Sequence, residues 1–205
     1  MSEFDAKAKE WDLNPVHLER TKAIAAEIIR QVPLNSSMTA LEYGAGTGLL
    51  SLELREKLGK ITLMDNSAEM NRMVGEKVKR EGINTFEVVL YNLEEKPYDG
   101  RFDLIFTQMV LHHVADIRAI LGKFNEMLNP GGYLAIADLY TEDGSFHDSS
   151  FTGHKGFDVN ELTRQSEEQG FHKISTTPVY TIRRINENGS TAAFPIFLLL
   201  AEKKA

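Results

Sequence analysis

Three glycines at alternate positions, Gly44, Gly46 and Gly48, stand between Glu42 and a run of leucines. Glycine carries no side chain and permits positive φ, so such a loop lets the backbone approach a ligand closely, although the same residues also suit a tight turn. A dinucleotide-binding turn has the pattern G-x-G-x-x-G, and Leu49 occupies the position of its third glycine. No G-K-[ST] follows, which excludes a P-loop. The loop therefore matches neither of these phosphate-binding patterns.

Polar side chains also follow the next three predicted strands. Asp65 and Asn66 follow the second, Asn92 the third, and Thr107 with Gln108 the fourth. In an open parallel sheet, ligands bind beyond the carboxyl ends of the strands, so we expect these groups to face the glycine loop. A carboxylate at Asp65 would form charge-assisted hydrogen bonds to ligand hydroxyl groups.

The elements that must position these residues alternate along the chain. An Asn14-Pro15 start predicts a leading helix with Ile24, Ile28, Ile29 and Val32 on one face. After residue 140 the alternation gives way to an irregular loop, and Asn186-Glu187-Asn188-Gly189 predicts the turn of a terminal hairpin. We expect strands over 39–43, 61–64, 86–90, 102–106, 133–139, 172–182 and 193–202, and helices over 49–58, 68–80, 117–128 and 158–169.

Alternating strands and helices at this spacing predict an α/β fold: a doubly wound, mostly parallel seven-stranded sheet with helices on both faces and a C-terminal antiparallel β-hairpin. We expect one domain, 1–205. Its parts are an N-terminal helical leader (1–33), a cofactor-binding core (34–140), a substrate-side loop and helix (141–171) and the hairpin (172–205).

The order Glu42, glycine loop and Asp65, seventeen residues after Gly48, resembles the class I S-adenosylmethionine-dependent methyltransferases, and the resemblance covers residues 34–139. It implies that the loop passes under the methionine part of S-adenosylmethionine and that Asp65 accepts hydrogen bonds from both ribose hydroxyls. Asn92-Leu93 resembles the family's Asp-Leu, which meets the adenine amino group. Asn lacks the negative charge of Asp, yet its side-chain oxygen can still accept a hydrogen bond from that amino group. Residues 102–108 and 128–134 resemble the family's fourth strand and the turn into its fifth.

The resemblance thus gives a set of cofactor-binding residues, and S-adenosylhomocysteine as the product. Met70, like Met64 and Leu93, offers apolar contact to adenine, although Met70 and Met73 also fit a helical stripe and a core role. The predicted set is Glu42, Gly44, Ala45, Gly46, Gly48, Asp65, Asn66, Met70, Asn92, Leu93, Thr107 and Gln108.

Histidine is the natural proton acceptor near neutral pH, but no catalytic residue is indicated. On the substrate side we place His112, His113, Tyr140, His147 and His154. For His112-His113 we favour a structural or pocket-wall role. A metal site at Asp143, His147, Asp148 and His154 is disfavoured, because His and Asp in a polar loop are usually solvated. Phe4, Trp11 and His17 of the leader either cover the cofactor or pack on the sheet.

Composition and motifs limit the classes of molecule that the protein could act on. A net charge of -7 disfavours a nucleic acid partner, whose phosphates attract Lys and Arg. The chain has no cysteine, which excludes mechanisms that need a protein thiolate as nucleophile or as ligand. Residues 107–110 (TQMV) lack the Asn/Asp-Pro-Pro-aromatic motif of base-amine and glutamine methyltransferases. No segment indicates a signal peptide or a membrane span, so we expect a cytoplasmic protein.

The sequence therefore predicts an enzyme that transfers a methyl group from S-adenosylmethionine to the O, N or C atom of a small molecule by in-line displacement. A noncatalytic module that binds the cofactor for regulation is the alternative. A nicotinamide oxidoreductase is disfavoured by the missing third glycine.

Overall fold

The computed structural model of the chain describes residues 12–185 and 190–204. Phe4 and Trp11 of the predicted leader, and the predicted turn at 186–189, lie outside the described residues. No helix among the described residues is both long enough and apolar enough to cross a membrane.

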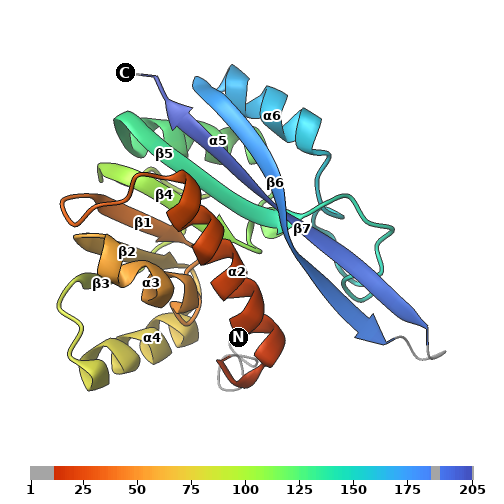
Figure 1. Cartoon of the computed structure of the whole chain (residues 1–205), viewed down its shortest axis with the longest axis horizontal. Helices are drawn as coiled ribbons and strands as arrows, with labels where there is room; N and C mark the ends of the chain where they lie inside the picture. Colours follow the sequence, from red (N-terminus) through yellow and green to blue (C-terminus); the bar gives the residue numbers. More distant parts are fainter. Residues whose placement is uncertain (1–11, 186–189, 205) are drawn as a thin grey trace.

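A single sheet forms the centre of the molecule, with the strand order β3-β2-β1-β4-β5-β7-β6 (Figure 1). Strands β1 to β5 run parallel to one another, whereas β7 is antiparallel to both β5 and β6. This confirms the predicted seven-stranded sheet with a C-terminal antiparallel hairpin. The strands are β1 (Thr39–Tyr43), β2 (Lys60–Asp65), β3 (Phe86–Leu90), β4 (Phe102–Gln108), β5 (Leu128–Leu139), β6 (Phe171–Ile185) and β7 (Thr191–Lys203).

Helices cover both faces of the sheet, as predicted. The first three pack on one face and the last two on the other. Side-chain caps begin four of them, at Asn14, Ser67, Asp116 and Asp158, each accepting a backbone N–H of the first turn. The helices are α2 (Pro15–Gln31), α3 (Leu49–Leu54), α4 (Ala68–Glu81), α5 (Ile117–Met127) and α6 (Val159–Glu168), with 3₁₀ turns η2 (Arg55–Lys57) and η3 (Leu111–His113).

Two hydrophobic cores lie on opposite sides of the sheet because side chains alternate along each strand. In β4, Leu104 and Phe106 join the core under α2, α3 and α4, whereas Ile105 joins the core under α5 and α6. All three side chains are fully buried. This central strand is therefore fixed from both faces, and its end is a rigid support for the loop that follows.

Three local predictions are wrong. Ile29 is exposed, because it lies about 100° around α2 from the buried Ile28. The helix predicted over 49–58 ends at Leu54 and tightens into η2. The strand predicted over 133–139 begins at Leu128, because a bulge between Phe102 and Leu104 lets β4 pair with both Leu128 and Tyr133.

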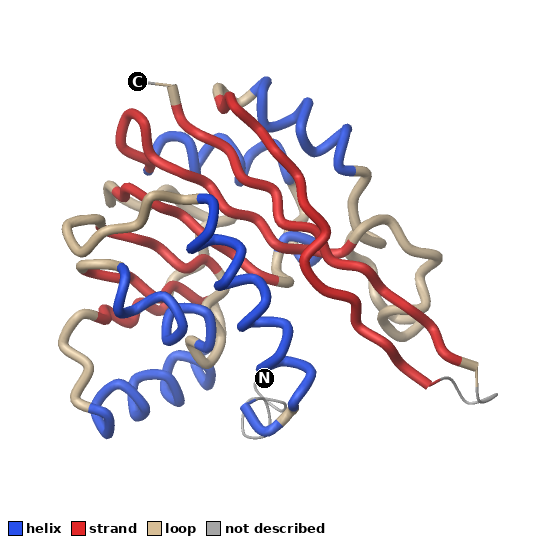
Figure 2. The backbone as a smooth tube through the Cα atoms, viewed as in Figure 1, coloured by secondary structure: helices blue, strands red, loops and turns tan. Residues whose placement is uncertain are grey.

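The strands β6 and β7 form a long ribbon that extends beyond the rest of the sheet (Figure 2). The loop between β5 and α6 packs against this ribbon, where the ring of Phe146 meets that of Phe194 at 5.2 Å between centroids. The guanidinium of Arg184 on β6 lies over Phe146, 4.1 Å from the ring centroid. The irregular loop is therefore held by aromatic contacts.

Candidate functional site

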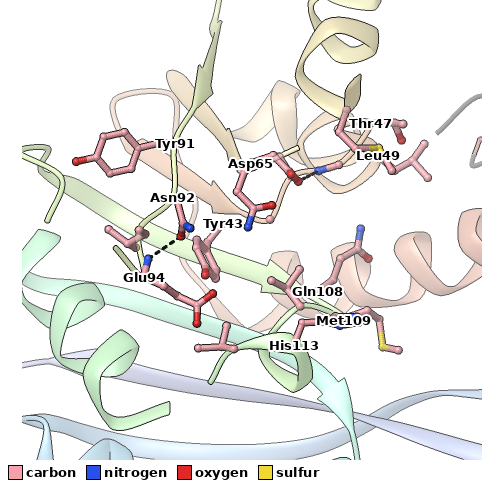
Figure 3. A pocket seen from close by; sticks show the side chains of 18 of the residues that line it. Tyr43, Thr47, Leu49, Asp65, Tyr91, Asn92, Glu94, Gln108, Met109 and His113 are labelled. Carbon is pink, nitrogen blue, oxygen red and sulfur yellow. Dashed lines mark hydrogen bonds between the residues drawn. The ribbon is translucent and has the colours of Figure 1, made fainter. Parts of the chain in front are cut away.

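A pocket opens at the carboxyl ends of β1, β2, β3 and β4, beside the point where strand order reverses between β1 and β4 (Figure 3). This is where open α/β sheets bind ligands. Its walls come from the loops after these strands, from α2 and from η3. The lining residues are Arg20, Tyr43, Gly44, Ala45, Gly46, Thr47, Leu49, Asp65, Asn66, Met70, Tyr91, Asn92, Leu93, Glu94, Gln108, Met109, Val110, His113 and Val114.

The three glycines of the first loop all have positive φ but serve different purposes. A Cβ on Gly44 would lie 2.4 Å from Val110, and a Cβ on Gly48 would lie 2.8 Å from both Leu63 and Val74. A Cβ on Gly46 would meet nothing closer than the sulfur of Met70, at 4.0 Å. Gly44 and Gly48 thus permit close packing of the chain, whereas Gly46 leaves space inside the pocket.

Asp65, at the end of β2, lines the pocket next to the glycine loop. Its carboxylate accepts the backbone N–H of Gly46 at 2.8 Å and that of Ser67 at 2.8 Å. Figure 3 shows the first of these bonds. These two bonds hold the carboxylate in a fixed orientation at the pocket.

The segment after β3 forms another wall of the pocket, with Tyr91, Asn92 and Leu93. The side-chain oxygen of Asn92 accepts the backbone N–H of Glu94 at 3.1 Å (Figure 3). This bond holds the Asn92 amide in a fixed orientation. Leu93 is completely buried, and Met70 of α4 is 2% exposed. An amide can hydrogen-bond the polar edge of a flat, nitrogen-rich ring, and the apolar side chains beside it can pack against that ring.

The end of β4 contributes Gln108, whose side-chain oxygen accepts the hydroxyl of Thr21 from α2 at 3.1 Å. This bond ties the leading helix to the pocket. Met109 follows with φ of 56°, a conformation that residues other than glycine rarely adopt and that often marks functional sites. Thr107 is buried in the strand and does not line the pocket.

Glu42 lies beneath the pocket rather than in its wall. Its carboxyl accepts the backbone N–H of Ser51 at 3.1 Å and the Ser51 hydroxyl, and it is 1% exposed. Burial raises the pKa of Glu42 to about 8, although the two Ser51 bonds oppose that shift. Glu42 therefore ties β1 to α3 as a mostly protonated acid at neutral pH.

We expect Glu42→Gln to change how stability depends on pH. The folded pKa of about 8 exceeds the ordinary 4.5, so the native protein holds a proton that the unfolded chain releases between these values. The stabilising effect of that proton is complete below about pH 4.5 and is lost as the pH rises to about 8. Glutamine has no such loss, so the variant should gain about 2–4 kcal/mol on wild type between pH 5 and pH 8 in urea unfolding.

Glu53→Gln, on the exposed face of α3, is the matched control for removing one carboxylate. Parallel pH profiles for wild type and Glu42→Gln would contradict the assignment of a buried, protonated acid.

Every predicted cofactor residue except Glu42, Gly48 and Thr107 lines the pocket. Those three support it from outside. Met64, predicted to touch adenine, is completely buried and does not line the pocket either.

The predicted substrate-side histidines gather near the end of β5. His112 is 2% exposed, and its Nδ1 lies 2.7 Å from the carboxylate of Asp138, which is completely buried. His113, the next residue, lines the pocket instead. It also lines a neighbouring pocket formed with Val114, His147, Asp148, Phe151 and His154. His113 and Val114 thus separate the two spaces, whereas Tyr140 packs edge-on against Phe197 and lines neither.

A candidate metal-ligand group differs from the one that we considered in the sequence. Within the described parts of the chain, His112, His113 and His147 bring one ring nitrogen each within 4.8 Å of one another. Asp143 lies apart, exposed and accepting the backbone N–H of Ser145 at 3.0 Å. The ring of His112 also packs at a tilt against those of His113 and His147, and His147 stacks on Phe151, so the group is an aromatic cluster as well.

A family model described as a methyltransferase domain matches residues 16–176. The chain belongs to the S-adenosylmethionine-dependent methyltransferases. The match spans α2, the pocket and α6, so the predicted family, enzyme class and cofactor are confirmed: this methyltransferase uses S-adenosylmethionine.

Individual relatives agree with this assignment. The methyltransferase is 31% identical over 162 residues to a ubiquinone biosynthesis O-methyltransferase of Cereibacter sphaeroides, covering 71% of this chain and 65% of that one. It is 29% identical over 120 residues to an uncharacterized methyltransferase of Schizosaccharomyces pombe, covering 55% and 42%. The chain thus spans less than two thirds of the length of these curated relatives.

Solved structures share the fold at low identity. A complex of the Haloferax volcanii Trm112 methyltransferase activator with a methyltransferase matches with a TM-score of 0.80 at 16% identity, covering 100% of this chain and 99% of that one. Haemonchus contortus phosphoethanolamine N-methyltransferase 2 with S-adenosyl-L-methionine matches with a TM-score of 0.73 at 13% identity, covering 100% and 61%.

Several pocket residues of the methyltransferase were not predicted from sequence. Tyr91 and Glu94 flank the predicted Asn92-Leu93, and Met109 and Val110 follow the predicted Gln108. Arg20 had a signal that could have revealed it: it precedes the buried Ile24 by four residues and therefore falls on the buried face of α2. A charged residue at a core position of an amphipathic helix is a candidate for function.

Proposed function

We propose that the enzyme methylates a small-molecule acceptor at an O, N or C atom, with the acceptor entering past His113. The observation that supports this most is that one pocket is lined by Asn92, Asp65 and Gly46 and also by His113. Beyond His113 lies the second pocket, formed by residues of the loop between β5 and α6. We assign the cofactor to residues 34–140 and the acceptor side to 141–171.

In this proposal, each wall of the pocket binds a different part of the cofactor. Asp65 binds the ribose hydroxyls, Asn92 and Leu93 meet the adenine, and the glycine loop passes close to the methionine part. When bound, the cofactor supplies a methyl group on a sulfonium, an already activated carbon. The chain positions the acceptor atom in line with that carbon and excludes water, which can supply much of the rate.

A screen for S-adenosylhomocysteine release tests the proposal. Phenols, amines, carboxylic acids and phosphate esters are incubated with the protein and S-adenosylmethionine, and product above the acceptor-free blank is measured. We expect turnover of at least one acceptor, and we expect His113→Ala to lower kcat/KM for it about tenfold or more while S-adenosylhomocysteine affinity changes little.

His172→Ala, on β6 and outside both pockets, is the matched control. Cofactor binding without turnover of any acceptor would contradict the enzymatic assignment in favour of a binding module. Equal turnover by His113→Ala and wild type would contradict the acceptor route.

A further inference from the structure

Three histidines from two separate segments meet beside the cofactor pocket. His112 and His113 belong to the short η3 turn, and His147 belongs to the loop between β5 and α6. One ring nitrogen of each histidine lies within 4.8 Å of those of the other two. The fold therefore brings together nitrogen donors that are far apart in the sequence.

The spacing of the three rings suits a single metal ion. The centroid of the His112 ring lies 4.2 Å from that of His113 and 5.1 Å from that of His147. The centroids of His113 and His147 are 5.3 Å apart. Imidazoles that bind a tetrahedral zinc ion at about 2.0–2.1 Å have ring centroids about 5 Å apart. The rings therefore need mainly to turn, rather than to travel, for their nitrogens to meet one ion.

Asp138 prepares His112 to act as a ligand. Its completely buried carboxylate lies 2.7 Å from Nδ1 of His112. A carboxylate at this distance holds the ring proton on Nδ1, so Nε2 keeps its lone pair for a metal. Histidines that bind metals in proteins almost always donate their other ring N–H to a carboxylate, a carbonyl or water in this way. His112 thus has the hydrogen bond that a metal ligand is expected to have.

The donor atoms select the metal. Neutral imidazole suits zinc and its neighbours among the transition metals, whereas magnesium and calcium prefer oxygen ligands. Three protein ligands leave a fourth position for water or for an oxygen atom of another molecule, as in catalytic zinc sites. His113 and His147 both line the second pocket, so a molecule bound in that pocket lies next to the fourth position.

We propose that His112, His113 and His147 bind a zinc ion and that Asp138 orients His112 toward it. The site lies where the second pocket meets the cofactor pocket, because His113 lines both. The proposal goes beyond methyl transfer and does not depend on it, since the three histidines bind zinc whether or not an acceptor is methylated.

Zinc titration of tag-free, metal-stripped protein tests the site. Zinc chloride is titrated by calorimetry into wild type, His147→Phe and His172→Phe. Phenylalanine at 147 keeps a ring that stacks on Phe151 but removes the nitrogen donor. His172, on β6 and outside both pockets, is the matched control. We expect wild type and His172→Phe to bind one zinc ion with a Kd on the order of a micromolar or tighter, and His147→Phe to bind about 100-fold more weakly or worse.

Cobalt gives a second measurement that reports coordination geometry. Co²⁺ substitutes for zinc and absorbs visible light strongly when it is four-coordinate. We expect this absorption with wild type and its loss in His147→Phe. Asp138→Asn keeps the size of the side chain but removes its charge, and we expect it to lower zinc affinity about 10- to 100-fold. Melting temperatures show whether Asp138→Asn folds; His147→Phe changes a loop residue and decides the question if it does not.

Three results would overturn the assignment. The first is the absence of saturable zinc binding by the wild type, and the second is equal zinc affinity in His147→Phe and wild type. The third is a loss of affinity in His172→Phe as large as that in His147→Phe. In each case the three histidines would be an aromatic packing cluster only. Zinc binding without turnover of any acceptor would refute the proposed methyl transfer and support this site, whereas turnover without zinc binding would do the reverse.

Discussion

Asp65→Ala should weaken the binding of S-adenosylhomocysteine about 100-fold or more. The carboxylate accepts the N–H groups of Gly46 and Ser67. In the proposed function it also accepts the two ribose hydroxyls. Hydrogen bonds to a charged group contribute about 1.5–3 kcal/mol each, so the loss of two amounts to about 3 kcal/mol or more. Isothermal titration calorimetry measures the change directly.

The conservative variant separates charge from shape. Asp65→Asn keeps one acceptor oxygen and should lose about tenfold. Asp99→Ala, exposed and outside the pocket, is the control and should bind as wild type does. Because Asp65 also orders the loop, melting temperatures are needed; an affinity for Asp65→Ala within a few-fold of wild type would contradict the ribose assignment.

Alanine at Gly44 should mainly lower stability, whereas alanine at Gly46 should mainly weaken ligand binding. At Gly44 the new Cβ lies 2.4 Å from Val110, and we expect a loss of about 2–5 kcal/mol in the free energy of unfolding from overlap and from positive φ. At Gly46 the Cβ meets only Met70, at 4.0 Å, so only the backbone cost of about 1–2 kcal/mol applies. That Cβ points into ligand space, and we expect S-adenosylhomocysteine affinity to fall about 10- to 100-fold.

Urea unfolding and calorimetry on the same two variants check this contrast. Gly48→Ala, which would contact Leu63 and Val74, is expected to behave like Gly44→Ala. If Gly46→Ala bound S-adenosylhomocysteine as tightly as wild type, the ligand would not pass over this glycine.

The sequence predicted several residues that line the pocket, because their position along a strand determines where they lie. Asp65, Asn92 and Gln108 each end or follow a parallel strand, and parallel strands end at the same edge of the sheet. Glu42 was harder to place because it lies inside β1, where successive side chains point to opposite faces, and its side chain faces α3. The three loop glycines look alike in sequence but have different surroundings. Their separate roles can be told apart only once the packing of α3 and α4 is known.

The acceptor side could not be predicted in the same way. His112 and His113 are adjacent, yet one bonds a buried carboxylate and the other faces the pocket, because the short η3 turn rotates them apart. Asp138 lies in an ordinary apolar strand pattern, and its partner His112 lies 26 residues earlier in the sequence. Arg20 was not predicted as a pocket residue, although its spacing from Ile24 places it on the buried face of α2.

Titration of S-adenosylhomocysteine into the intact protein, monitored by calorimetry beside Asp65→Ala, tests most directly that this pocket is the cofactor site of a methyltransferase. We expect saturable one-to-one binding by the wild type and a loss of about 100-fold or more in the variant. Absence of binding to the intact protein, or equal binding by Asp65→Ala, would contradict it.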